Sequence, residues 1–296
     1  MATTNSLEKQ RFFLSLVGVR IDLLDRDKRE VSSASGFLLR DGQKTYLHSC
    51  WHVFTGLDPH HLTLGLELPR RRYARVWVQG ADERQPGVEV IGGSQFIDIP
   101  LYEDPGAVHG PLSPSWEQCA PHYPNEFLNS VGIYHPAFTE AARLEVPSGG
   151  LNLSSAQFVD EHFTVLPRDA YLPSPGDKCL IVGFPYGFSS AGADQPTAVA
   201  LTRFVAGTPI SGHRRGEVLL DGCGAPSMSG GPVLIERTNQ LFLLGVYTGS
   251  IFPDHALHTT EKTTAIGTVS DLRMPLWGSM PFTRRPNSPI GGPSKA

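Results

Sequence analysis

Charged residues and cysteines are scarce in this 296-residue sequence. Asp, Glu, Lys and Arg together make up 18% of it, and the formal net charge is −4. The chain therefore lacks the basic excess with which proteins bind nucleic acid or anionic membranes. The four cysteines are far apart and show no CxxC or other metal-ligand spacing, so we expect thiols rather than disulfides, and no metal or organic cofactor. They are Cys50, Cys119, Cys179 and Cys223.

Long apolar runs are also missing. No stretch approaches the roughly 20 apolar residues that a membrane-spanning helix needs. The N-terminal segment has charges ahead of a short apolar stretch, but Gly18 and Arg20 interrupt that stretch and no small-residue cleavage site follows. We therefore expect a soluble cytoplasmic protein that has no secretory signal and no membrane partner.

Short strand-like runs separated by turn residues fill most of the chain. They form one set in residues 1–103 and a second in residues 176–275. Regularly spaced short strands are typical of an all-β barrel or sandwich. Residues 104–175 are rich in proline and glycine, and we interpret them as an irregular connector with a short helix within residues 127–146 and a candidate regulatory role. Residues 276–296 are predicted to be a flexible tail.

The segment "GCGAPSMSGGPVLIE", residues 222–236, places Ser229 directly before two glycines and a strand. Glycine pairs allow close backbone approach or positive φ angles. The segment is either an ordinary glycine-rich turn or a loop that presents a serine. A serine hydroxyl becomes a nucleophile only beside a base, and that base needs a third group to fix its tautomer.

His52 is the best candidate base among the 11 histidines, because "SCWHVF" places it in a small-residue turn after the strand "KTYLHS". His48 lies within that strand and is better explained as a packed or surface residue. Most of the others lie in loops, as do His60, His61, His255 and His258.

Asp98 is the best candidate for the third group. It lies between apolar residues in "QFIDIPLY", where burial of an unpaired carboxylate is unfavourable. An imidazole N–H would be a suitable partner. The alternative is an aspartate on the solvent face of a strand edge.

The segments "SCWHV", "DIPL" and "SMSGGPV", in this order, resemble the motifs of the trypsin-like (chymotrypsin-fold) serine peptidases. The resemblance is strongest to the bacterial and intracellular branch related to the high-temperature-requirement proteases. It implies two antiparallel six-stranded-type β-barrels with the active site in the cleft between them. No PDZ domain is expected, because only about twenty residues follow the second lobe.

The resemblance also implies a role for each matching residue. His52 becomes the general base, Asp98 its orienting acid and Ser229 the nucleophile of a serine endopeptidase that cleaves protein or peptide substrates through an acyl-enzyme. The backbone N–H groups of Ser227 and Ser229 would form the oxyanion hole. Positions expected to contact substrate are Cys223, Thr248 and Gly249, although Cys223 is better explained as a small buried residue.

One departure from the family pattern bears on activity. Ser227 replaces a glycine, and a side chain there disfavours the turn that aims its N–H inward. We therefore expect an oxyanion hole that forms only when a substrate or a regulatory protein partner binds.

Two other functions remain as alternatives. One is a catalytically silent binding or regulatory module with the protease fold. The other is an α/β-hydrolase esterase, since "SMSGG" is close to a Gly-x-Ser-x-Gly elbow. That fold needs alternating strands and helices, which this strand-rich sequence does not suggest.

Overall fold

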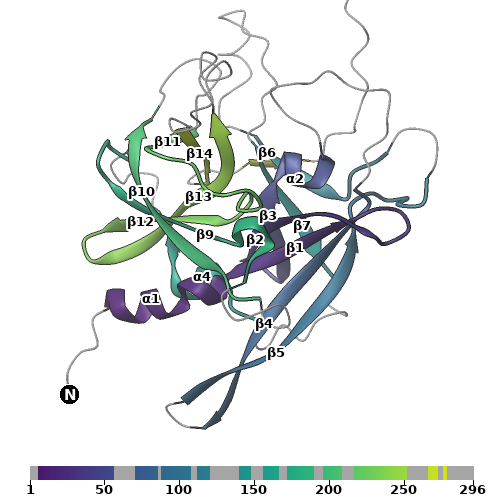
Figure 1. Cartoon of the computed structure of the whole chain (residues 1–296), viewed down its shortest axis with the longest axis horizontal. Helices are drawn as coiled ribbons and strands as arrows, with labels where there is room; N and C mark the ends of the chain where they lie inside the picture. The colour runs from purple at the N-terminus through teal and green to yellow at the C-terminus, as the bar shows by residue number, and fades with distance from the viewer. Residues whose placement is uncertain are drawn as a thin grey trace, which may run out of the picture.

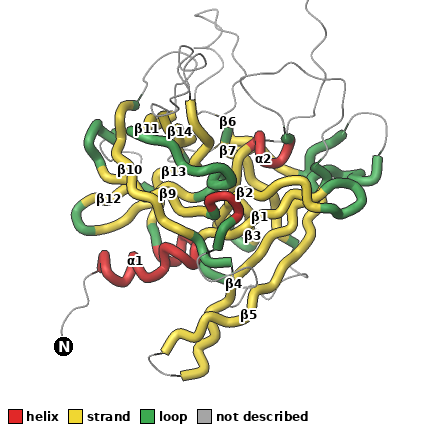
Figure 2. The backbone as a smooth tube through the Cα atoms, viewed as in Figure 1, coloured by secondary structure: helices red, strands yellow, loops and turns green. Residues whose placement is uncertain are grey.

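A computed structural model describes the chain over eleven segments. They are residues 6–56, 71–85, 88–107, 112–120, 140–147, 156–166, 172–189, 196–208, 217–251, 266–272 and 276–278. Two β-sheets account for most of the described residues, and they lie side by side (Figures 1 and 2).

The first sheet contains eight strands in the order β15-β6-β7-β3-β2-β1-β4-β5. Its neighbouring strands pair antiparallel throughout. The β4–β5 hairpin extends away from the rest of the molecule (Figure 1). The strands are β1 (Gly18–Leu24), β2 (Glu30–Asp41), β3 (Lys44–Cys50), β4 (Tyr73–Gln85), β5 (Val88–Pro100), β6 (Trp116–Ala120), β7 (Ala141–Val146) and β15 (Leu276–Gly278).

The second sheet closes into a six-stranded barrel. Its order is β12-β9-β10-β11-β14-β13, and pairing of β12 with β13 closes the ring. A short strand, β8, joins β13 in parallel. This architecture confirms the prediction of an all-β protein, and its antiparallel pairing does not fit the parallel sheet of an α/β-hydrolase. The strands are β8 (Thr164–Val165), β9 (Lys178–Gly183), β10 (Val199–Gly207), β11 (Glu217–Leu220), β12 (Pro232–Arg237), β13 (Gln240–Ile251) and β14 (Ile266–Asp271).

Helices are few and short, and α1 is a feature that the sequence interpretation missed. Residues 12–21 fall within the first set of strand-like runs, but the chain is helical up to Val17 and β1 starts only at Gly18. The Gln10 side chain holds α1 on the second barrel, since it donates to the Leu241 carbonyl (3.1 Å) and accepts from the Leu241 N–H (2.8 Å). Within the described segments, no helix has the length and apolar character to cross a membrane. The helices are α1 (Ser6–Val17), α2 (Trp51–Thr55), α4 (Val159–His162) and the 3₁₀ turn η2 (Pro185–Gly187).

The proposed connector and tail contribute strands to both sheets. β6 and β7 join the first sheet through pairing of β7 with β3, and β8 joins the second. The short helix expected within residues 127–146 is absent from its described part, which is strand β7; the rest lies outside the described residues. β15, predicted as tail, pairs with β6, while residues 279–296 lie outside the described residues.

Replacement of Gly245 tests how tightly the strands of the closed barrel pack. A Cβ at this position in β13 would lie 2.1 Å from the Ser270 carbonyl oxygen of β14, too close for any side chain. We expect Gly245→Ala to lower the free energy of unfolding by about 2–3 kcal/mol in urea titrations. Gly207→Ala in β10 is the control, because no described atom lies within 4 Å of its added methyl. Equal losses in the two variants would contradict this account.

Candidate active site

His52 lies in α2, a single helical turn that follows β3. Cys50 is extended, and Gly56 ends the turn in the left-handed conformation (φ 76°) with its N–H on the His52 carbonyl. The Arg71 guanidinium donates to the carbonyls of His52 (2.8 Å) and Val53 (2.6 Å), which satisfies acceptors that a helix end leaves open. These hydrogen bonds hold the backbone carbonyl of His52 in place.

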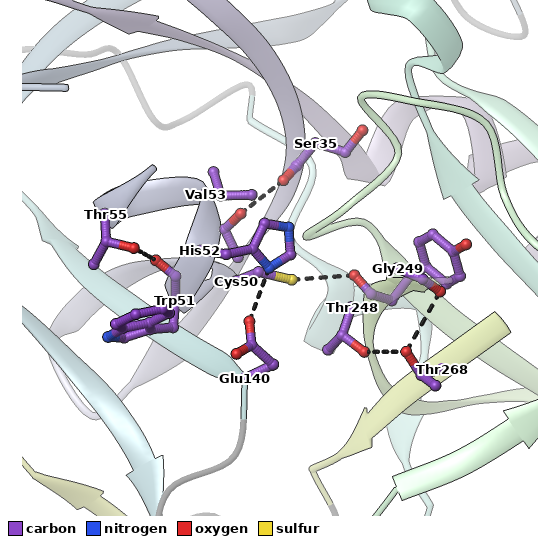
Figure 3. Close-up of polar contacts among 12 residues, drawn as sticks. Ser35, Cys50, Trp51, His52, Val53, Thr55, Glu140, Thr248, Gly249 and Thr268 are labelled. Carbon is purple, nitrogen blue, oxygen red and sulfur yellow. Dashed lines mark hydrogen bonds and ion pairs between the residues drawn. The ribbon is translucent and has the colours of Figure 1, made fainter. Parts of the chain in front are cut away.

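Glu140 is the acid that faces His52. Its Oε2 lies 2.8 Å from His52 Nδ1 (Figure 3). The β3–β7 register pairs Cys50 with Ala141, and the Trp51 N–H donates to the Glu140 carbonyl at 2.6 Å. A carboxylate at Nδ1 holds the proton on that nitrogen, so Nε2 becomes the acceptor on the opposite side of the ring. The imidazole is therefore arranged to accept a proton.

Asp98, the acid predicted from the sequence, contacts cations, and the carboxylate at His52 Nδ1 is that of Glu140. Arg75 lies directly opposite Asp98 in the β4–β5 pair and donates from Nε (2.7 Å) and Nη2 (3.1 Å) to its carboxylate. Lys28 adds a third contact at 3.3 Å. The Arg75 guanidinium is the main cause that lowers the pKa of Asp98. The apolar neighbours rightly indicated that Asp98 needs a partner, but the partner is a cation across the strands.

A sequence signal for Glu140 was present. Glu140 stands directly before the strand "AARLEV". It also lies between His52 and Ser229 in the chain. The signal was missed because residues 127–146 were interpreted as connector with a helix, and a helix would not pair with the strand of His52.

The loop of residues 227–231, hereafter the serine loop, packs against the strands that lead to His52. The Ser35 N–H of β2 donates to the Ser229 carbonyl at 3.0 Å. The Gly230 N–H and the Cys50 thiol both donate to the Tyr247 carbonyl, at 2.8 Å and 3.1 Å. The structure thus brings the serine loop of the second barrel beside the end of β3 in the first sheet, two residues before His52.

The two glycines after Ser229 are required by this close contact. A Cβ at Gly230, whose φ is 92°, would lie 2.0 Å from Ser49 Oγ and 2.1 Å from the Ser35 carbonyl oxygen. A Cβ at Gly231 would lie 2.0 Å from the Val182 carbonyl oxygen of β9. Any side chain at either position would push the serine loop away from one sheet or the other.

Ser227 takes the turn conformation that a glycine would take. Its φ is 70°, in the left-handed region. Its Oγ lies 3.1 Å from Ser33 Oγ, and its carbonyl accepts a hydrogen bond from Ser35 Oγ at 2.7 Å. No described residue accepts a hydrogen bond from the N–H of Ser227 or Ser229. The side chain has not prevented the turn, contrary to the expectation from the sequence.

The three positions expected to contact substrate lie in different surroundings. Cys223 is half-buried, and its carbonyl accepts from Arg203 Nε (3.0 Å) and Nη2 (2.7 Å). The Thr248 hydroxyl is buried and lies 2.8 Å from that of Thr268 (Figure 3). At Gly249 (φ 141°) an added Cβ would meet no described atom within 4 Å. Of the three, only Gly249 presents open space beside its backbone.

The cysteines are all described, and none forms a disulfide. Burial raises the pKa of the Cys50 thiol well above its usual value, and the charge of Glu140 raises it further. Burial likewise raises the pKa of Cys179 to about 12. The Cys50 thiol therefore stays protonated and acts as a hydrogen-bond donor beside His52, not as a thiolate nucleophile.

Comparison with known proteins found structural similarity only. No family model matches the sequence, and no curated protein matches it. The serine endoprotease of Yersinia pestis superposes with a TM-score of 0.44 and 13% identity, covering 92% of this chain and 63% of that one. The Rv3671c protease of M. tuberculosis, in its active form, gives 0.43 and 14%, covering 89% of this chain and 79% of that one. The chain thus spans less than two thirds of the length of the first of these proteins.

The Asp98–Arg75 pair predicts a pH-dependent contribution to stability. The pKa of Asp98 is lower in the folded protein than in an unfolded chain, so its stabilisation is present above the unfolded value and is lost as pH falls through the folded value. We expect Asp98→Asn to lower the free energy of unfolding by about 1–3 kcal/mol at pH 7, and by progressively less below about pH 4.

Urea unfolding of wild type and variant between pH 3 and pH 8 measures this difference. Asp104→Asn is the control, because Asp104 is exposed and its carboxylate accepts only from the Gly106 N–H in the described structure. If the loss of unfolding free energy in Asp98→Asn were constant over this pH range, the ion-pair explanation would be wrong.

Proposed function

We propose that this protein is a serine endopeptidase with Ser229 as nucleophile, His52 as general base and Glu140 as the acid that orients it. The observation that carries the proposal is the 2.8 Å contact between His52 Nδ1 and Glu140 Oε2, beside which the serine loop packs. A buried carboxylate on the far nitrogen of an imidazole is the arrangement by which enzymes fix a histidine base. The order of base, acid and serine in the chain matches the resemblance to trypsin-like peptidases.

The proposed reaction proceeds by acyl transfer. Ser229 Oγ attacks the scissile carbonyl carbon while its proton passes to His52 Nε2, and the carbonyl oxygen takes the negative charge. His52 then gives the proton to the leaving amine as the C–N bond breaks, which leaves an ester on Ser229. Water, deprotonated by His52, hydrolyses that ester. Glu140 stabilises the imidazolium in both steps.

The backbone N–H groups of Ser227 and Ser229 are proposed to bind the developing oxyanion. Both belong to the serine loop, and neither donates to a described residue. Donors of this kind contribute about 10²–10³ each to turnover. Their availability supports the proposal, and Ser227 adopts the left-handed conformation that a glycine would take.

A fluorophosphonate probe tests the nucleophile, because it labels only activated serines. We expect the wild-type protein to be labelled and Ser229→Ala to remain unlabelled. Ser174→Ala, at an exposed serine in the turn before β9, is the control and should label like wild type. If the wild type is not labelled, the protease-fold binding module becomes the better explanation.

Variants of two acids test which of them orients His52: Glu140, which contacts His52 in the structure, or Asp98, which was predicted from the sequence. Glu140→Gln should slow labelling by about three to four orders of magnitude, because an amide favours the wrong histidine tautomer. Asp98→Asn should slow it less than about tenfold, since Asp98 faces Arg75. Rates are compared at a temperature at which both variants are folded. If Asp98→Asn slowed labelling more than Glu140→Gln, Asp98 would be the acid that orients His52.

A further inference from the structure

Ser227 occupies a strained position at the proposed oxyanion hole. Among the described residues, five other than glycine have a positive φ, and Ser227 is one of them at 70°. L-residues rarely take this conformation because Cβ crowds the following carbonyl, so the surroundings must hold the residue there. The contacts around the Pro226–Ser227 peptide show what holds it.

One side of this peptide is fixed by η2. The Tyr186 N–H donates to the Pro226 carbonyl at 2.7 Å. The C=O and N–H of a trans peptide point in opposite directions. A carbonyl held toward Tyr186 therefore directs the Ser227 N–H away from η2, and the proposed oxyanion donor has a set direction.

The other side is fixed by two serines of β2. Ser33 and Ser35 are two residues apart on the strand, so their side chains lie on the same face. Ser35 Oγ donates to the Ser227 carbonyl at 2.7 Å, and Ser33 Oγ lies 3.1 Å from Ser227 Oγ. The second contact uses the very atom that distinguishes Ser227 from glycine.

We propose that Ser33 is a positioning residue for the oxyanion hole. Its hydroxyl binds the Ser227 side chain and so holds the strained turn, with the Ser227 N–H directed for catalysis before substrate arrives. This inference rests on the proposed function. It also replaces the expectation of a hole that forms only on binding, because the serine that was expected to disfavour the turn supplies the hydrogen bond that maintains it.

A double-mutant cycle tests the coupling between Ser33 and Ser227. With a fluorophosphonate probe, Ser33→Ala should lower the maximal inactivation rate about fivefold to tenfold, because one neutral hydrogen bond contributes a factor of this size. The affinity for the probe should change little. In a Ser227→Gly background, the same Ser33→Ala change should alter the rate less than about twofold, because the partner hydroxyl is gone and glycine adopts the turn without help.

Ser32→Ala is the matched control, since Ser32 neighbours Ser33 but lies on the opposite face of β2; it should label like wild type. Thermal melts establish that every variant is folded. Labelling of wild type together with an unchanged rate for Ser33→Ala, or an equal loss in both backgrounds, overturns the inference and leaves the proposed function standing. Absence of labelling in wild type overturns the proposed function and the inference with it.

Discussion

The site depends on one junction between the two sheets, the hydrogen bonds of Ser35. This residue of β2 is fully buried, donates from its N–H to the Ser229 carbonyl and from its Oγ to the Ser227 carbonyl, and accepts from the Phe184 N–H. The proposed base and nucleophile come from different sheets. Their relative position is therefore only as well defined as this contact, which fixes both ends of the turn that carries Ser229.

Small residues make the junction possible. Ser35 and Ser49 approach the serine loop so closely that Gly230 cannot carry a Cβ, and Gly231 is equally confined by β9. The role of the glycine pair is thus less to give flexibility than to allow two backbones to meet at hydrogen-bonding distance. Close backbone contact excludes water, and polar groups in such a place act more strongly on a developing charge.

The two acids differ through their partners. Glu140 and Asp98 are similarly shielded, with side chains 17% and 14% exposed, and each has a well-formed contact. Asp98 faces an arginine that is permanently charged, so the pair is a structural ion pair. Glu140 faces the imidazole of His52, the proposed general base. The same carboxylate chemistry therefore stabilises the fold at one position and prepares a base at the other.

The sequence by itself determined the all-β class, the two sets of strands, and the serine and histidine in their local turns, because these follow from strand periodicity and turn chemistry over a few residues. It also indicated that Asp98 needs a partner. Which partner each acid meets was decided by strand register, since Arg75 opposes Asp98 and β7 brings Glu140 beside His52. The pairing of β7 with β3 joins two segments that are far apart in the chain, and local sequence carries no information on such a register. The left-handed Ser227 was likewise unpredictable from its own propensity, because the hydroxyls of Ser33 and Ser35 that hold it come from the other sheet.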